Sequence, residues 1–175
     1  MADMRTDLRA LSLKQPWLSW AILRLGKRIE NRESWQGCAH RGPILLHASQ
    51  GVGSQLEFSE CVTQIAAISR AWPTASTVDG SYRGGVWRPA PDLPRGAVVG
   101  VARIVATVDG RSGLTPLLGG PDLSHQERWW FGGFALVLDD VHELPEPIPC
   151  KGALGLWRPP ADVVARVREQ LGEWP

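Results

Sequence analysis

The 175-residue sequence contains little cysteine, a single tyrosine and almost no net charge. Its three cysteines are an odd number without paired spacing, which disfavours a disulfide framework and favours a reducing compartment. Together with the four scattered histidines they form no zinc-binding pattern, so the sequence predicts no metal site and no cofactor. A P-loop, a dinucleotide-binding glycine motif and a Gly-x-Ser-x-Gly elbow are all missing, which argues against the enzyme classes that depend on them.

Long apolar runs are missing as well. No stretch approaches the length that a membrane-spanning helix needs, and residues 1–10 lack the apolar core of a signal peptide. We therefore expect a cytoplasmic protein without a membrane partner. The net charge is only +1, whereas proteins that hold long duplexes by neutralising phosphates usually carry more positive charge. A nucleic-acid site in this chain would therefore be small and local.

The residue that the chain has in excess is tryptophan, with nine copies. Some indoles fill a core, and others can serve as stacking surfaces for single-stranded or flipped bases without any need for net charge. Hydrophobic residues make up 43% of the chain and charged residues 21%, which is typical of a globular protein. The length predicts a single domain over residues 10–175, preceded by a disordered lead over residues 1–9.

The chain is organised around its residues 11–32. Residues 11–13 alternate apolar and polar side chains, as in a half-buried strand. Pro16 marks the start of a buried, mostly apolar helix, and Gly26 is expected to be the left-handed cap at its end. A charged strand should follow, and because side chains two apart on a strand share a face, Glu30 and Arg32 should point the same way.

The start of this helix has no good N-cap. Gln15 stands where Ser, Thr, Asp or Asn would normally satisfy the free backbone N–H groups. Such a helix start, next to Lys14, can accept an anion or a polar ligand. The alternative is that water or Ser12 satisfies these groups.

Runs of apolar residues predict three further strands. The first, over residues 44–49, is nearly all apolar and should be central in its sheet. His47, near its end, is either a structural histidine or a proton carrier and hydrogen-bond donor beside a cleft. The other two strands are expected at residues 96–108, with a bulge or bend at Gly100, and at residues 134–141.

Capping residues predict where the remaining helices begin. A helix over residues 54–71 should start with a capping box in which Ser54 is the N-cap and Glu57 its partner. Ser124 is expected to cap a short helix, and Asp162 the last helix of the chain.

Residues 72–95 are rich in proline, glycine and serine and are expected to form a long loop inserted into the domain. Tyr82, Arg83, Trp87 and Arg88 interleave aromatic and basic side chains there, which suits contact with phosphates and exposed bases. The alternative is a surface loop that its tryptophans pin to the core.

Several motifs resemble the ASCH domain, a family related to the PUA-like barrels. They are Leu11-Ser12-Leu13-Lys14-Gln15-Pro16-Trp17, then Gly26-Lys27, then Glu30 with Arg32, then Gly42 before an apolar strand. Residues 134–157, which end in Lys151-Gly152-Ala153-Leu154-Gly155-Leu156-Trp157, resemble the closing part of bacterial and phage members. The resemblance implies an α+β fold, namely a PUA-like small β-barrel of about five or six mostly antiparallel strands with flanking helices. It also implies a cleft that takes RNA, single-stranded DNA or a modified nucleoside.

We expect this cleft to combine basic residues, one acid and indole rings. Flanking cations would keep Glu30 ionised, and an ionised carboxylate can accept hydrogen bonds from the amino group of cytosine or adenine. Trp17 and either Trp129 or Trp130 would bracket the base, although Trp17 is equally suited to the core. The alternative is an ion-pair network at the end of a barrel. The full predicted set of nucleic-acid or ligand-binding residues is Lys14, Gln15, Trp17, Lys27, Glu30, Arg32, Trp129 and Trp130.

The resemblance also implies other activities. Some small ASCH proteins resemble amidohydrolases that remove acetyl from N4-acetylcytidine, and their catalytic Gly-Lys lysine matches Lys27. In that interpretation Lys27 and Glu30 are catalytic, although the family has threonine where this chain has Glu30, and Glu127 is the nearest match to a further catalytic glutamate. Other relatives look like metal-independent ribonucleases that use tyrosine, for which Tyr82 is the one candidate. The remaining alternative is a protein-interaction domain.

Overall fold

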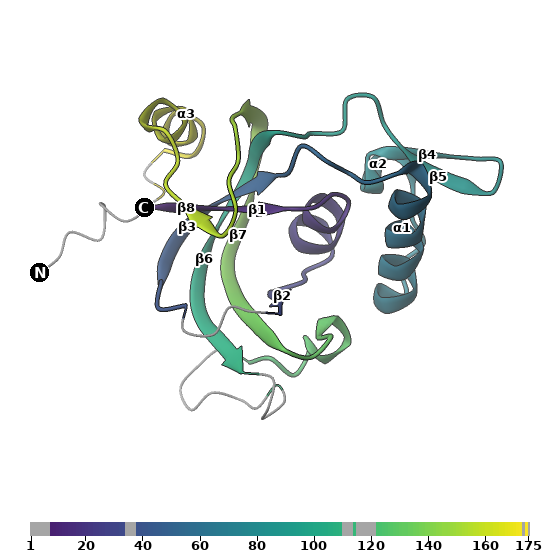
Figure 1. The fold of residues 1–175 in the computed structure, drawn as a ribbon, viewed down its shortest axis with the longest axis horizontal. Helices are drawn as coiled ribbons and strands as arrows, with labels where there is room; N and C mark the ends of the chain where they lie inside the picture. Colours follow the sequence, from purple (N-terminus) through teal and green to yellow (C-terminus); the bar gives the residue numbers. More distant parts are fainter. Residues whose placement is uncertain (1–7, 34–37, 110–113, 115–121, 173, 175) are drawn as a thin grey trace, which may run out of the picture.

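The computed structural model describes residues 8–33, 38–109, 114, 122–172 and 174. Within these residues the fold is α+β, and one curled sheet of six strands forms half a barrel (Figure 1). Its strands are β1 (Arg9–Leu13), β2 (Ile29–Arg32), β3 (Gly42–Ala48), β6 (Ala97–Asp109), β7 (Phe134–Pro149) and β8 (Leu156–Trp157). The order across the sheet is β2-β7-β6-β3-β1-β8, with β1 parallel to β3 and all other neighbours antiparallel. The predicted α+β class is therefore confirmed, with a half-barrel as its sheet.

The long pair β6–β7 gives the sheet its curl. Its register shifts at three places, one of them between Val98 and Gly100, which confirms the predicted irregularity. A Cβ at Gly100 would lie 2.7 Å from the carbonyl oxygen of His142, so only glycine permits this close approach. β7 extends beyond the predicted residues 134–141, because its pairing with β6 resumes at Ile148 and Pro149. Residues 144–147, which include two prolines, have no partner in the register with β6.

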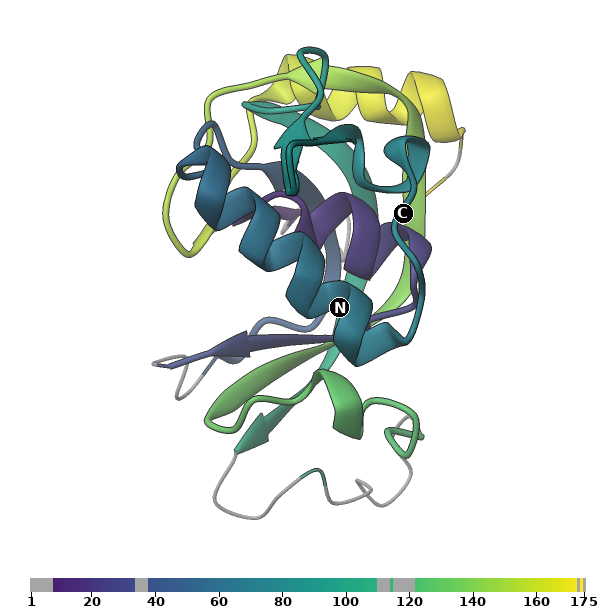
Figure 2. The same cartoon turned by 90° about the vertical axis from the view of Figure 1, so that its right-hand side faces the viewer.

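The first helix, η1 (Trp17–Arg24), lies inside the curl of the sheet. The helix α1 (Gln55–Ser69) covers the side of η1 that faces away from the sheet (Figures 1 and 2). The prediction of a buried helix after Pro16 is confirmed, since most of η1 has no contact with solvent. Its turns are wider than those of an α-helix: the N–H of Leu25 bonds to the carbonyl of Trp20 at 2.9 Å, an i→i+5 bond that makes it a π-helix. Gly26 follows with φ +73°, as predicted.

The helix α1 begins as predicted, because the side chains of Ser54 and Glu57 form a capping box. The predicted loop at residues 72–95 is wrong. It contains the short helix α2 (Ala75–Val78) and a two-stranded hairpin of β4 (Gly80–Arg83) and β5 (Val86–Pro89). Thr74 and Thr77 form a second capping box, and the two glycines of the hairpin turn both have positive φ, which is the geometry that tight hairpins favour.

Two predicted helix caps are also wrong. The short helix η3 (Glu127–Trp129) is preceded by Gln126 rather than Ser124, and α3 (Ala161–Leu171) by Pro160 rather than Asp162, and neither has a side-chain cap. Asp162 instead lies in the first turn of α3. Of the predicted lead, Arg9 begins β1, and residues 1–7 lie outside the described residues.

The largest core cluster joins η1, α1, the hairpin and strands β2 and β7, with Trp20, Phe58, Trp87 and Trp129 as its bulky members. Trp87 is buried there, and its backbone N–H donates to the Ser59 hydroxyl of α1 at 2.9 Å, so it pins the hairpin to the domain. Among the described residues, no helix has both the length and the apolar character that crossing a membrane requires.

Candidate functional site

A cavity of about 410 Å³, called the cleft below, opens where the end of β1, the start of η1 and the strand β2 meet. The structure brings five of the eight predicted site residues together along its wall: Lys14, Trp17, Lys27, Glu30 and Arg32. Gln15, Trp129 and Trp130 are not among its lining residues. The cleft therefore combines side chains from three separate elements, as the sequence pattern predicts.

An ion-pair row forms the charged wall of the cleft. The ammonium of Lys27 lies 3.0 Å from Oε2 of Glu30, and the guanidinium Nη2 of Arg32 lies 3.3 Å from Oε1 of the same carboxylate. Glu30 and Arg32 share a face of β2, which confirms the predicted alternation. Lys27 is only 3% exposed and Glu30 13%, so this is a largely desolvated pair rather than a surface contact.

Aromatic rings form a second wall. Lys27 Nζ lies 5.7 Å from the centre of the Trp17 ring, within the range of a cation–π contact. The Trp17 ring in turn meets Phe131 edge to face, with ring centres 5.8 Å apart. Trp17 is only partly buried, so one side of its indole faces the cleft while another packs on the core.

At the start of η1 the Gln15 side chain itself bonds to the first turn, a partner that neither of the two sequence interpretations named. The Gln15 side chain is buried; its Oε1 accepts from the backbone N–H of Ser19 at 3.1 Å, and its Nε2 donates to the Ser19 hydroxyl at 2.7 Å and to the Pro94 carbonyl at 3.2 Å. Lys14 remains exposed at the rim of the cleft.

The aromatic run at residues 129–131 reaches the cleft through its last member. Trp129 is fully buried in the core, and Trp130 packs against the same cluster. Phe131 lines the cleft instead. Asn31 of β2 holds this segment in place, since its amide donates to the Trp129 carbonyl at 2.8 Å and accepts from the N–H of Phe131 at 3.0 Å. The position of this run just before Gly132 and Gly133 was the available sequence signal, but it did not say which ring is exposed.

A larger cavity of about 670 Å³ adjoins the cleft and shares Ser12, Ser49 and Leu154 with it. His47 borders it but is buried: Nδ1 lies 3.1 Å from the Ser12 hydroxyl and Nε2 lies 3.0 Å from the Cys150 carbonyl. Burial lowers the pKa of His47, which favours the neutral ring, with Nε2–H donating to that carbonyl. This bonding ties β3 to the segment before β8 and favours the structural interpretation of His47.

The residues proposed for the ribonuclease and amidohydrolase alternatives do not all line the cleft. Tyr82 lines another cavity, on the hairpin, which has no lining residue in common with the cleft. Glu127 lies in η3 and is not a lining residue of the cleft either. In the described part of the chain, no group of three or more His, Cys, Asp or Glu side chains is placed to hold a metal ion.

No protein-family model matches this sequence, and no curated protein is significantly similar to it. The functional argument therefore depends on the cleft itself.

Proposed function

We propose that the cleft binds one unstacked or modified base of single-stranded RNA or DNA, and that the domain is an ASCH-type, PUA-like module. The observation that carries the proposal is the position of Glu30, held between Lys27 and Arg32 and facing the same cavity as the Trp17 ring. The ASCH-like motif residues 11–17 and 26–32 supply most of this wall, which supports the family resemblance.

The chemistry of the wall suits a nucleobase. A carboxylate that already accepts from two cations has lone pairs left for the exocyclic amino group of cytosine or adenine. The Trp17 and Phe131 rings offer an apolar surface to the face of the base. The volume of about 410 Å³ lies within the usual range of small-ligand pockets.

The charge balance of the cleft suits a single nucleotide rather than a long duplex. Three basic side chains, Lys14, Lys27 and Arg32, face one acid, Glu30. The local excess of positive charge can contact one or two phosphates, while the whole chain stays near neutrality.

Short labelled oligonucleotides test the proposal by fluorescence polarisation. We expect Lys14→Ala and Arg32→Ala each to weaken binding and to reduce the salt dependence of the affinity by about one contact per removed cation. Arg166→Ala, an exposed arginine of α3, is the charge-matched control and should bind like the wild type. If all three variants bind alike, the cleft is not the site. If the folded wild type binds neither RNA nor DNA, the protein-interaction alternative is favoured.

The amidohydrolase is the second candidate, and the contact between Lys27 and Glu30 favours it. A carboxylate 3.0 Å from the Lys27 amine is placed to orient that amine, which this interpretation uses as base or nucleophile. Incubation with N4-acetylcytidine, followed by mass spectrometry, should then show loss of the acetyl group for the wild type and not for Glu30→Gln. The absence of turnover by the wild type would remove this candidate for that substrate.

A further inference from the structure

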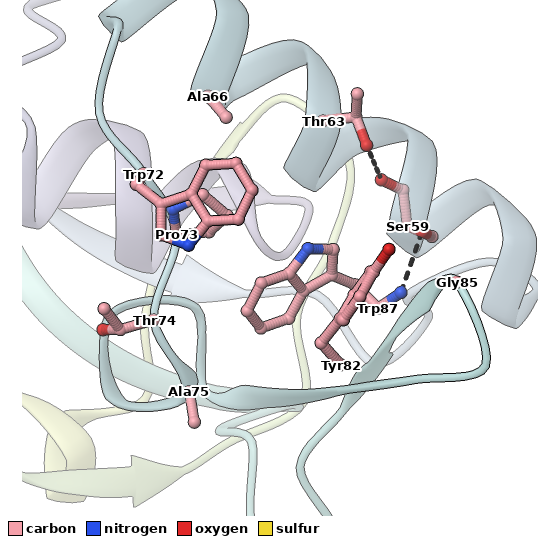
Figure 3. Close-up of a pocket in the computed structure, with 10 residues that line it drawn as sticks. All are labelled: Ser59, Thr63, Ala66, Trp72, Pro73, Thr74, Ala75, Tyr82, Gly85 and Trp87. Carbon is pink, nitrogen blue, oxygen red and sulfur yellow. Dashed lines mark hydrogen bonds between the residues drawn. The ribbon is translucent and has the colours of Figure 1, made fainter.

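A second cavity, called the aromatic pocket below, lies between α1, the hairpin β4–β5 and the segment that leads into α2. Its volume is about 430 Å³, and it shares no lining residue with the cleft. Figure 3 shows the indoles of Trp72 and Trp87 bordering the same space, with Tyr82 next to Trp87. The ring centres of Tyr82 and Trp87 are 5.4 Å apart, and their ring planes make an angle of 49°.

The three aromatic residues of this pocket have different roles. Trp87 is its buried floor and belongs to the core. Trp72 is 88% exposed and Tyr82 is 61% exposed, so these rings contribute little to folding and leave large apolar faces in water. The arrangement therefore combines both interpretations of residues 72–95, because one tryptophan anchors the segment and the other rings are free to contact a ligand.

The pocket selects a neutral, planar group. None of the ten residues that line it is charged, and its side-chain polar groups are hydroxyls, such as that of Thr63, and the indole nitrogens. A methylated ammonium group, the other usual ligand of aromatic cages, would find no acid in the lining to balance its charge. Uncharged heteroaromatic rings, which stack on exposed indoles, fit these walls better.

Three arginines lie close in the sequence to the rings of the aromatic pocket, and none of them lines it. Arg70, Arg83 and Arg88 are exposed, and each lies within two residues of one of the pocket's rings. Among the described residues, none of the three forms a salt bridge, whereas Asp79, one of the two acids of residues 72–95, is paired with Arg24 at 3.2 Å. The register of the hairpin pairs Tyr82 with Trp87, so Arg83 and Arg88 project from its opposite face.

From this arrangement we infer, on the basis of the proposed nucleic-acid function, that the aromatic pocket is a second base-binding subsite, which takes an unstacked base of a single-stranded nucleic acid. The neutral walls hold the base. Arg70 and the two arginines on the far face of the hairpin attract the phosphate backbone through their field rather than through contacts inside the pocket. A proline-rich peptide also binds to aromatic grooves, but such a ligand makes no use of three arginines that have no salt-bridge partner in the part of the chain that the structure describes. The charge therefore favours the nucleic acid.

The test uses single-stranded oligonucleotides and the matched pair Trp72→Ala and Leu56→Ala. Both residues are exposed, and Leu56 lies on α1 outside the pocket lining, so neither change should unfold the protein. We expect Trp72→Ala to weaken binding roughly tenfold to hundredfold, as removal of one stacking platform does, and Leu56→Ala to have no effect. An abasic oligonucleotide of equal length should bind the wild type and Trp72→Ala equally well.

Two results would overturn the inference. One is an unchanged oligonucleotide affinity for Trp72→Ala. The other is a proline-rich peptide that binds the wild type but not Trp72→Ala, while oligonucleotide binding stays the same. Because the cleft is tested separately by Lys14→Ala and Arg32→Ala, failure of the cleft and failure of the aromatic pocket give different patterns across the same variants.

Discussion

Replacing Lys27 by methionine tests whether the charged wall of the cleft is built as described. The substitution keeps an unbranched chain in a position that is 3% exposed and removes only the charge that lies 3.0 Å from Glu30. Breaking a fully buried ion pair from one side costs about 3–5 kcal/mol. Glu30 is 13% exposed and keeps Arg32 at 3.3 Å, so the expected loss is smaller, about 1–3 kcal/mol.

Urea unfolding, followed by tryptophan fluorescence, measures this loss as a shift of the midpoint to lower urea. The double variant Lys27→Met with Glu30→Gln should recover much of the stability, because it no longer leaves a carboxylate short of its cation. Glu143→Gln is the control, since Glu143 pairs with Arg24 at the surface and its loss should cost under about 1 kcal/mol. A Lys27→Met variant as stable as the wild type, or a double variant no more stable than Lys27→Met alone, would refute the reasoning.

Three further predictions concern the neighbouring structure. Gly152→Ala should lower the free energy of unfolding by about 1–3 kcal/mol, because its methyl group would lie 2.4 Å from Cε1 of His47, whereas Gly51→Ala has open space and should leave the urea midpoint nearly unchanged. Burial lowers the pKa of His47 below its ordinary value of 6.5, so the unfolded chain binds a proton at this ring more readily than the folded chain does. The free energy of unfolding should therefore fall as the pH drops from above 6.5 towards the lowered pKa. Urea titrations at several pH values should show a weaker pH dependence for His47→Gln. Trp129→Ala should cost about 3–5 kcal/mol and Trp72→Ala less than about 0.5 kcal/mol, since the first ring is fully buried and the second is not; equal losses of stability would contradict these assignments.

Periodicity and capping predicted the elements that depend on local chemistry. The alternation at residues 11–13, the box of Ser54 with Glu57 and the bulge at Gly100 all correspond to the structure. The π-helical turns of η1 could not be predicted, because they depend on packing inside the curled sheet and no residue marks them. The hairpin at residues 80–89 was not predicted, because the glycine, proline and serine of this segment were interpreted as a long loop. The same residue types also form the tight turn between two short strands.

For the cleft, alternation on β2 was enough to place Glu30 and Arg32 on one face, and Gly26 has the left-handed conformation expected of the cap before Lys27. Gln15 shows the limit of this approach. Its type and position indicated a missing cap, but its carbonyl oxygen and amide nitrogen reach Ser19 one turn later, a contact that only the folded geometry reveals. The choice of Phe131 over Trp129 and Trp130 likewise depends on which ring finds space in the core.

The helix η1 connects the two proposed subsites. Its first residue, Trp17, lines the cleft, and its last, Arg24, donates to the carbonyls of Ser76 and Thr77 in α2, the helix next to the aromatic pocket. A displacement of η1 caused by a base on Trp17 would therefore shift α2, and occupancy of one subsite would alter the affinity of the other. By thermodynamic linkage this effect on affinity would be equal in both directions, whichever subsite is filled first.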